Sequence, residues 1–282
     1  MSIDLTKPIL VLGAKGKTGS RVAQQLRDRG LTVRAGSRSG NPPFDWEDQS
    51  TWAPAVQGID AAYITFQPDL TFPGASDLIR GFSEVAVANG VRRLVLLSGR
   101  NEEGALRSEE AVTESGVAEW TIVRSSFFAQ NFSEGFWVGS VLSGELAVPA
   151  GGVAEPFVDV DDIAEIVIQA LTSDTHVGQL YEVTGPRLLT FADAAAEISQ
   201  AIGREVRYIP ITFEEFSAAL AAEGLPTDFV EGLVGLFKEV LDGRGSYLGD
   251  GVERALGRKP KDFADYAREA AASGAWSALV AA

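Results

Sequence analysis

Three glycines near the start of the chain, Gly13, Gly16 and Gly19, constrain the fold more than any other feature of the sequence. They follow the segment Ile9-Leu10-Val11-Leu12, a short apolar run typical of a strand that is buried on both faces of a parallel sheet. After them, apolar residues between positions 22 and 26 recur at helical spacing. The sequence therefore predicts a strand, a glycine loop and a helix, which together begin a β-α-β unit.

The same alternation continues through the first half of the chain. Apolar runs predict further strands at 31–35, 61–64, 93–97 and 120–123, and helices are predicted at 77–88 and 102–114. Strands that alternate with helices predict an α/β fold, a doubly wound parallel sheet of the Rossmann type.

The pattern changes after Arg124, where an aromatic-rich segment begins. Further on, the sequence predicts a strand at 180–183 and a helix at 159–171. After Thr190 it predicts an alanine-rich helix that ends at Ile202, and further helices at 213–223, 229–241 and 262–272. We expect residues 1–185 to form a nucleotide-binding domain, with residues 127–155 contributing to a second lobe. Residues 186–282 are expected to form a smaller, mostly helical substrate lobe.

The overall charge and the absence of cysteine exclude several kinds of function. The chain has 39 acidic and 24 basic side chains and a net charge of −15, so binding to nucleic acid or to an anionic membrane is not expected. With no cysteine, it cannot form disulfides or use a thiolate. The start of the chain lacks the apolar run of a secretory signal, and no stretch has the roughly 20 apolar residues of a membrane span. We expect a cytoplasmic monomer or homodimer.

The glycine spacing predicts a binding site for a dinucleotide. A first glycine permits a tight turn, a second lets the backbone approach a pyrophosphate, and a third allows close packing of the helix on the strand. Gly13, Gly16 and Gly19 occur in that order, with the Gly-x-x-Gly-x-x-Gly spacing associated with short-chain dehydrogenases. The alternative is a glycine-rich turn that binds nothing. The predicted cofactor-binding residues are Gly13, Lys15, Gly16, Lys17, Thr18, Gly19, Ser37, Arg38, Thr65, Phe66 and Ser98.

The end of the second predicted strand favours NADP(H) over NAD(H). NAD-dependent enzymes place a carboxylate there, on the ribose 2′-hydroxyl, but no acidic residue occurs between Leu31 and Gly40. Arg38 and Ser37 instead offer a guanidinium and a hydroxyl to a 2′-phosphate. Arg34 lies within the strand and is the less suitable arginine. A solvated surface position is the alternative for Arg38.

The sequence resembles the NmrA-like group of atypical short-chain dehydrogenases, and within it the festuclavine and agroclavine dehydrogenase type. The resemblance covers most of the chain up to about Ile211. It rests on Gly13-Ala14-Lys15-Gly16-Lys17-Thr18-Gly19, Ala35-Gly36-Ser37-Arg38-Ser39, Phe44-Asp45-Trp46, Leu96-Leu97-Ser98-Gly99, Thr121-Ile122-Val123-Arg124, residues 127–134, residues 157–164 and residues 181–186. It implies either a reductase or a cofactor-sensing regulator, because a shared fold does not determine the activity.

The sequence lacks the usual proton donor of this class. Short-chain dehydrogenases protonate the alkoxide product with a tyrosine that has a lysine four residues later. None of the five tyrosines of this chain has a lysine at that spacing. Ser98, which follows a predicted strand, and Glu109 are the candidate catalytic residues. The alternatives are a small residue ending a strand for Ser98 and a solvated helix face for Glu109 and its neighbour Glu110.

An acceptor that is already cationic needs no proton donor, because hydride addition gives a neutral product directly. Such a site must orient the acceptor, exclude water and surround the cation, for which aromatic side chains are suited. The candidate substrate-binding residues follow the strand predicted at 120–123, and each could instead be a core residue; they are Phe127, Phe128, Phe132 and Trp137. We therefore expect an NADPH-dependent reductase of hydrophobic small molecules that carry an iminium, conjugated or quinone-like electrophile. The rival is a catalytically silent NADP(H) sensor.

Two other groups of polar residues are given structural roles. Asp159, Asp161 and Asp162 are expected to cap the following helix, and no metal site is predicted. The single histidine, His176, lies in a segment of loop composition and is expected to be exposed.

Overall fold

The fold is that of a computed structural model, which describes residues 3–277. The chain forms two compact units, each built from several segments. The first unit runs from the N-terminus to Ser125 and includes Asp161–Val183 and Asp250–Arg258. The second consists of Ser126–Val160, Thr184–Gly249 and the chain from Lys259 onward. Residues 250–258 thus belong to the first unit, whereas the sequence division placed them in the C-terminal lobe.

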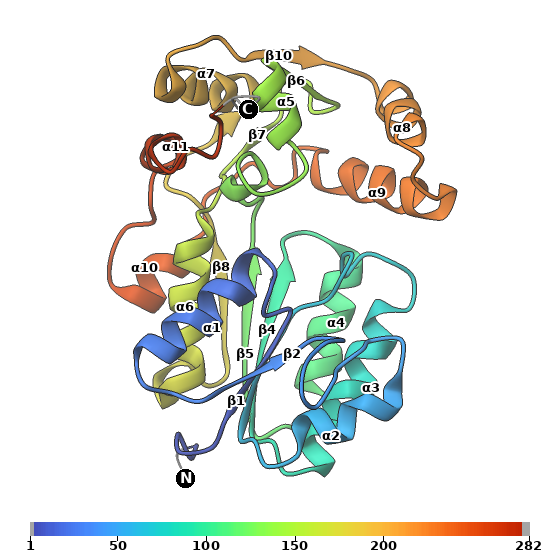
Figure 1. Cartoon of the computed structure of the whole chain (residues 1–282), viewed down its shortest axis with the longest axis vertical. Coiled ribbons are helices and arrows are strands. Elements are labelled where there is room, and N and C mark those ends of the chain that lie inside the picture. The colour runs from blue at the N-terminus through green and yellow to red at the C-terminus, as the bar shows by residue number, and fades with distance from the viewer. Residues whose placement is uncertain (1–2, 278–282) are drawn as a thin grey trace, which may run out of the picture. The chain divides into compact units, whose positions relative to one another are not determined.

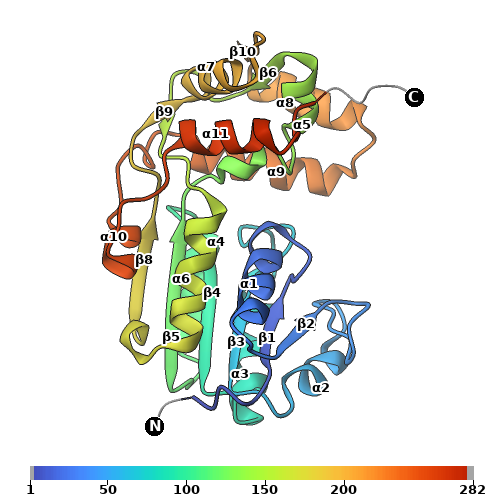
Figure 2. The same cartoon turned by 60° about the vertical axis from the view of Figure 1, so that its left-hand side comes forward.

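A six-stranded parallel sheet forms the centre of the first unit. Its strands are β1 (Ile9–Leu12), β2 (Val33–Gly36), β3 (Ala61–Ile64), β4 (Arg93–Gly99), β5 (Glu119–Ser125) and β8 (Gln179–Val183), in the spatial order β2-β1-β3-β4-β5-β8. The helices are α1 (Lys17–Asp28), α2 (Trp52–Val56), α3 (Ala75–Ala88), α4 (Glu103–Thr113), α6 (Val160–Thr172) and α10 (Gly251–Leu256). Helices α1 and α6 cover one face of the sheet and α3 and α4 the other (Figures 1 and 2). The predicted doubly wound α/β fold is confirmed.

The pattern of side chains along the strands explains why helices cover both faces. In β1 and β3 every residue is buried, so neither face of these strands meets water. Alternate residues of the strands point to the same face, and on one face Leu10, Leu94 and Leu96 join a single apolar cluster. Helix α3 adds Ile79 and Phe82 to this cluster, from positions that recur at helical spacing.

The second unit is mostly helical, as predicted, but also contains two small sheets. Its helices are α5 (Val138–Ser143), α7 (Phe191–Ile202), α8 (Phe213–Ala222), α9 (Thr227–Val240) and α11 (Phe263–Ala272). Strand β6 (Glu145–Val148) pairs in parallel with β10 (Arg207–Pro210), and β7 (Ala154–Glu155) pairs in antiparallel with β9 (Leu189–Thr190). The sequence analysis missed these four strands.

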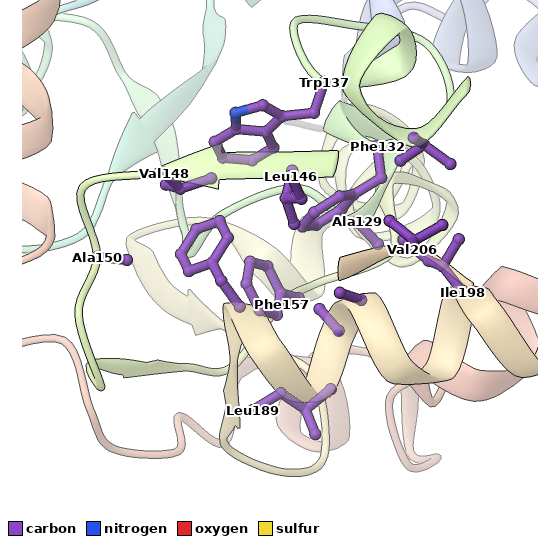
Figure 3. Close-up of a cluster of buried hydrophobic side chains, with 14 of the residues drawn as sticks. Ala129, Phe132, Trp137, Leu146, Val148, Ala150, Phe157, Leu189, Ile198 and Val206 are labelled. Carbon is purple, nitrogen blue, oxygen red and sulfur yellow. The ribbon is translucent and has the colours of Figure 1, made fainter. Parts of the chain in front are cut away.

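Aromatic side chains fill the core of the second unit (Figure 3). The rings of Phe132 and Trp137 are 5.0 Å apart, and Phe157 and Phe191 pack edge to face at 5.2 Å. The indole nitrogen of Trp276 donates a hydrogen bond to the backbone carbonyl of Phe132. This core is separate from the apolar cluster of the first unit, so each unit buries its own hydrophobic residues.

The structure contradicts the expectation that His176 is exposed. The side chain is buried, and its Nδ1 lies 2.8 Å from the hydroxyl oxygen of Tyr181. Burial lowers the pKa of His176 below its ordinary value, and the nearby positive charge of Arg93 lowers the pKa further. The ring is therefore held neutral in the folded protein.

Replacing His176 with phenylalanine tests this arrangement. His176 takes up a proton near pH 6.5 in the unfolded chain but only at lower pH in the folded chain. The stability that depends on a neutral His176 is therefore fully present above about pH 6.5 and is lost as the pH falls below it. We expect His176→Phe to cost about 1 kcal/mol at pH 7.5, from the lost hydrogen bond, and to weaken the loss of stability between pH 7 and 5.5. Urea unfolding at several pH values measures both effects. An identical pH dependence in the two proteins would show that His176 does not titrate on unfolding.

Candidate functional site

The glycine loop lies at the point where the strand order of the sheet reverses. The chain passes from β1 outward to β2 and then returns to β3 on the other side of β1. Loops after the carboxyl ends of two such strands diverge, and doubly wound folds bind ligands in the crevice between them. Here the loop after β1 meets Thr65, directly after β3, whose hydroxyl donates to the carbonyl of Leu12 at 3.2 Å.

Two of the three glycines are required by the fold itself. Gly13 has a φ of +63°, in the left-handed region that disfavours a side chain, and a Cβ there would overlap the hydroxyl of Thr65. A Cβ at Gly19 would overlap the backbone carbonyl of Gly13. Gly19 therefore lets α1 pack directly against the end of β1, the role expected of the third glycine.

Gly16 differs because neither its backbone conformation nor its protein neighbours require a glycine at this position. Its backbone is extended, with φ −80° and ψ 175°, a conformation open to any residue. A Cβ would meet only the Gly13 carbonyl oxygen at 3.3 Å and the Gln67 side chain at 4.0 Å. Gly16 is also the N-cap of α1, and no side chain caps this helix end or places an acid in its first turn. A helix start without a side-chain cap, together with the small residue, fits a bound pyrophosphate.

The basic and hydroxyl residues of the loop have different surroundings. Lys15 is exposed and its ammonium donates to the hydroxyl of Ser39 at 3.1 Å, which brings the loop close to the segment after β2. Lys17 is half-buried. Thr18 is buried and its hydroxyl accepts a hydrogen bond from Tyr63 at 3.0 Å. Thr18 thus joins α1 to the central strand β3.

The two arginines near β2 differ as the sequence analysis expected. Arg34 donates to the backbone carbonyls of Ala55 and Gln57 at 2.8 and 2.7 Å, so its guanidinium is engaged at the end of α2. Arg38 is exposed, after the carboxyl end of β2, and Ser37 beside it is half-buried. Arg38 is therefore the arginine that remains available to a ligand.

Phe66, predicted to contact the cofactor, lies half-buried beside the aromatic cluster of the first unit. Its ring is 5.2 Å from that of Trp46, which in turn packs against Phe44 and Phe82. Thr65 and Phe66 directly follow β3 and so share the carboxyl edge of the sheet with the glycine loop.

Ser98 and Glu109, the candidate catalytic residues, are joined by a hydrogen bond. The Ser98 hydroxyl donates to Glu109 Oε1 at 2.6 Å, and both residues are buried. The alternative that Glu109 lies on a solvated helix face is therefore wrong, although the adjacent Glu110 is exposed. Arg124 also donates to both carboxylate oxygens of Glu109, at 2.9 and 2.5 Å.

The sequence analysis did not include Arg124 and Glu182 among the site residues. Arg124 Nη1 donates to Glu182 Oε1 at 3.1 Å, and Arg100 lies 3.9 Å from the other oxygen of Glu182. The sequence did contain a signal that could have identified them: Arg124 and Glu182 are charged residues in or next to apolar runs that predict buried strands. A charged residue in such a run needs a partner, which the sequence alone does not name.

The aromatic residues predicted to bind substrate divide into two pairs, all in the second unit. Phe132 is 0% exposed and Trp137 1% exposed, so both are core residues and offer no surface to a substrate. The Trp137 indole nitrogen is buried without a hydrogen-bond partner among residues 3–277. Phe127 and Phe128 are partly exposed and remain the candidates.

The three aspartates near the start of α6 form ion pairs. Asp161 pairs with Arg21, Asp162 with Arg258 and Asp159 with Lys261, and Asp159 also accepts a hydrogen bond from Gln130. Within residues 3–277 no group of three His, Cys, Asp or Glu side chains is placed to hold a metal ion. In the same part of the chain, no helix combines the length and the apolar character that a membrane crossing requires.

The fold and the glycine loop are those of an α/β protein of the Rossmann type. No family model matches the chain. It is 30% identical to an uncharacterised oxidoreductase, YesF, of Bacillus subtilis, over 94% of this chain and 96% of the relative. It is also 30% identical to agroclavine dehydrogenase of Claviceps fusiformis, over 92% and 95% of the two chains. The chain therefore belongs to the NmrA-like group of atypical short-chain dehydrogenases, which includes the clavine dehydrogenases.

A solved structure of triphenylmethane reductase from Citrobacter, complexed with NADP(H), shares the fold. Its TM-score is 0.72 at 20% identity, and the similarity covers 93% of this chain and 99% of that one.

The contrast between Gly16 and Gly19 gives a test of the loop. Gly16→Val should leave a folded protein that no longer binds a dinucleotide, because the side chain occupies the path of the pyrophosphate and little of the protein. Gly19→Ala should instead destabilise the protein, because its methyl group overlaps the Gly13 carbonyl. Circular dichroism with thermal unfolding checks the fold, and calorimetry checks binding. Unchanged dinucleotide affinity in folded Gly16→Val would contradict the assignment of the loop.

Proposed function

We propose that this chain is an NADPH-dependent reductase that delivers hydride to a hydrophobic small molecule with an iminium, conjugated or quinone-like electrophile. The residues present fit the dinucleotide: Gly16 leaves space at the uncapped start of α1, and Arg38 is exposed after β2. The reductase of the Citrobacter complex holds NADP(H), and the relatives are named as an oxidoreductase and a dehydrogenase, which supports the same chemistry here. When bound, the cofactor supplies the hydride, that is, two electrons and one hydrogen nucleus.

The chain's own residues in this proposal hold the reactants rather than move protons. The loop amides and Lys15 bind the phosphates, and Arg38 binds the 2′-phosphate. Phe127 and Phe128 contribute apolar surface to an acceptor, where a cation over an aromatic ring is favourable.

The observation that carries the acceptor class is the lack of a positioned acid. No tyrosine has a lysine four residues later, and the Ser98 hydroxyl donates its hydrogen bond to Glu109. A ketone would become an alkoxide without the tyrosine acid that usually protonates it, whereas an iminium ion that takes up hydride becomes a neutral amine. The site therefore suits acceptors that carry their positive charge before hydride arrives.

Arg38→Ala tests the choice of cofactor. A charge-assisted hydrogen bond contributes about 1.5–3 kcal/mol, so the wild type should bind NADPH about tenfold to a hundredfold more tightly than NADH, and the substitution should remove most of that preference. Arg29→Ala is the matched control, because Arg29 is also exposed but lies at the C-terminal end of α1, the end away from the glycine loop. Calorimetry with both cofactors gives the ratio. Equal affinities in the wild type would refute the NADP(H) assignment.

A pair of acceptors with matched shape, one cyclic iminium and one ketone, tests the reaction. The iminium should be reduced well and the ketone poorly, because loss of general acid assistance typically costs about 10²–10⁴-fold in rate. For an imine, kcat/KM should fall as the pH rises through the pKa of the imine itself, since only the protonated form accepts hydride.

Steady-state NADPH oxidation measures both acceptors. Ketone turnover as fast as iminium turnover would overturn the mechanism. Tight NADPH binding without turnover of iminium ions, quinones or cationic dyes would favour the cofactor sensor.

A further inference from the structure

The Ser98 hydroxyl has a fixed orientation that bears on what it can bind. Ser98 is the penultimate residue of β4, at the carboxyl edge of the sheet. Its one proton is donated to Glu109 Oε1 at 2.6 Å, and within residues 3–277 no group donates a hydrogen bond to Ser98 Oγ. A hydroxyl has one donor and two acceptor lone pairs, so Ser98 has only acceptor capacity left.

Glu109 is held in place as the acceptor of that hydrogen bond. Both carboxylate oxygens face Arg124: Nε donates to Oε1 at 2.9 Å and Nη2 to Oε2 at 2.5 Å. This two-bond geometry fixes the orientation of the carboxylate plane. The Glu109 side chain is 9% exposed and that of Arg124 18%, so water competes little with these bonds.

A third strand holds Arg124 in place. Strand register sets Ser98 of β4 opposite Arg124 of β5, and Arg124 opposite Glu182 of β8. Residues that are opposite in a parallel sheet point to the same face, which is the face that Glu109 approaches from α4. Arg124 donates its third bond to Glu182 at 3.1 Å, and the hydrogen bonds to Glu109 raise the pKa of Arg124 above its ordinary value. The guanidinium therefore stays charged.

We propose that Arg124 and Glu182 are positioning residues that fix Glu109 as the acceptor of the Ser98 proton, so that Ser98 presents only lone pairs and selects substrates whose reacting group carries an N–H. A protonated cyclic imine is such a group. This inference rests on the proposed reductase function and adds a specificity determinant to it.

The chemistry of the two acceptor classes explains the selection. The N–H of a protonated imine donates to the Ser98 oxygen before hydride arrives and remains a donor, more weakly, in the amine product. A ketone oxygen gains negative charge as hydride arrives, and it would face lone pairs instead of a donor. The same hydroxyl therefore favours one acceptor and disfavours the other.

Ser98→Ala tests the hydrogen bond with two iminium ions of matched shape, one with N–H and one with N-methyl. The variant should lower kcat/KM about tenfold to a hundredfold for the N–H iminium and leave the N-methyl iminium nearly unchanged, because only the first has a proton to donate. An equal loss for both would overturn the inference. It would place Ser98 against the cofactor or in a purely structural role.

Glu109→Gln tests the direction of the proton. An amide bonds Arg124 less strongly and can donate to Ser98 through its nitrogen, which frees the hydroxyl to donate elsewhere. The ratio of N–H iminium to ketone turnover should therefore fall at least tenfold. Glu110→Gln is the control, since it removes the same charge from an exposed neighbour on α4.

Arg124→Lys should also lower the ratio of N–H iminium to ketone turnover, but by a smaller factor than Glu109→Gln. A lysine keeps the charge but cannot make the two-bond contact with Glu109. A loss of stability with an unchanged ratio in both Glu109→Gln and Arg124→Lys would show that the ion pairs only hold α4 to the sheet.

Binding gives a readout that does not depend on turnover. With NADP⁺ present, calorimetry should show that the wild type prefers a protonated cyclic secondary amine over its N,N-dimethyl analogue of equal charge, and that Ser98→Ala loses this preference. No preference in the wild type would contradict the inference. If the wild type reduces no acceptor at all, the proposed function fails instead, and this binding measurement still decides the role of Ser98.

Discussion

The close approach of α1 to the end of β1 is the contact on which the rest of the first unit depends. It requires that Gly19 have no side chain, because any Cβ would overlap the carbonyl of Gly13. That approach brings the first turn of α1 to the carboxyl edge of the sheet, where no side chain caps the helix beside Gly16. The same residues therefore serve the packing of the helix and, in the proposed function, the binding of an anion. A larger residue at Gly19 would alter both, whereas one at Gly16 would alter only the second.

Two arginines, the buried Arg93 and the half-buried Arg124, form ion pairs at opposite ends of the central strands of the sheet. Arg93 begins β4 and is 1% exposed, and it bonds Glu119 and Asp174 at 2.5 and 2.6 Å. Arg124, near the end of β5, bonds Glu109 and Glu182. An unpaired buried charge costs several kcal/mol, so the buried Arg93 needs its partners. At the carboxyl end, Glu109 also accepts a hydrogen bond from the Ser98 hydroxyl, and the proposed role of this ion pair in substrate selection rests on that contact.

The second unit uses its aromatic residues mainly to form a core. Phe132, Trp137, Phe157 and Phe191 are almost fully buried against one another, and large rings of this kind supply much apolar area in a small unit. Arg187 joins this core to α11 through two bonds of 2.8 Å to Asp262 and a third to Glu197. Phe127 and Phe128 retain exposed surface, and so the candidate substrate contacts lie at the start of this unit, directly after β5.

The sequence by itself determined the strands of the first unit and the loop after the first of them. Strands buried on both faces are recognisable as continuous apolar runs, and the three glycines mark a turn, an open approach and a tight packing contact; all of these are local properties. The pairing of β6 with β10 was missed for two reasons. Both strands are short, and they are separated by about 60 residues of chain, so no local sequence pattern encodes their pairing. Likewise, the sequence showed acids at 109 and 110 and an arginine at 124, but only the packing of α4 on the sheet decided which acid is buried. His176 and Phe132 were misjudged for the same reason: whether a side chain meets water depends on which distant segments cover it, and that is settled only when the chain has folded.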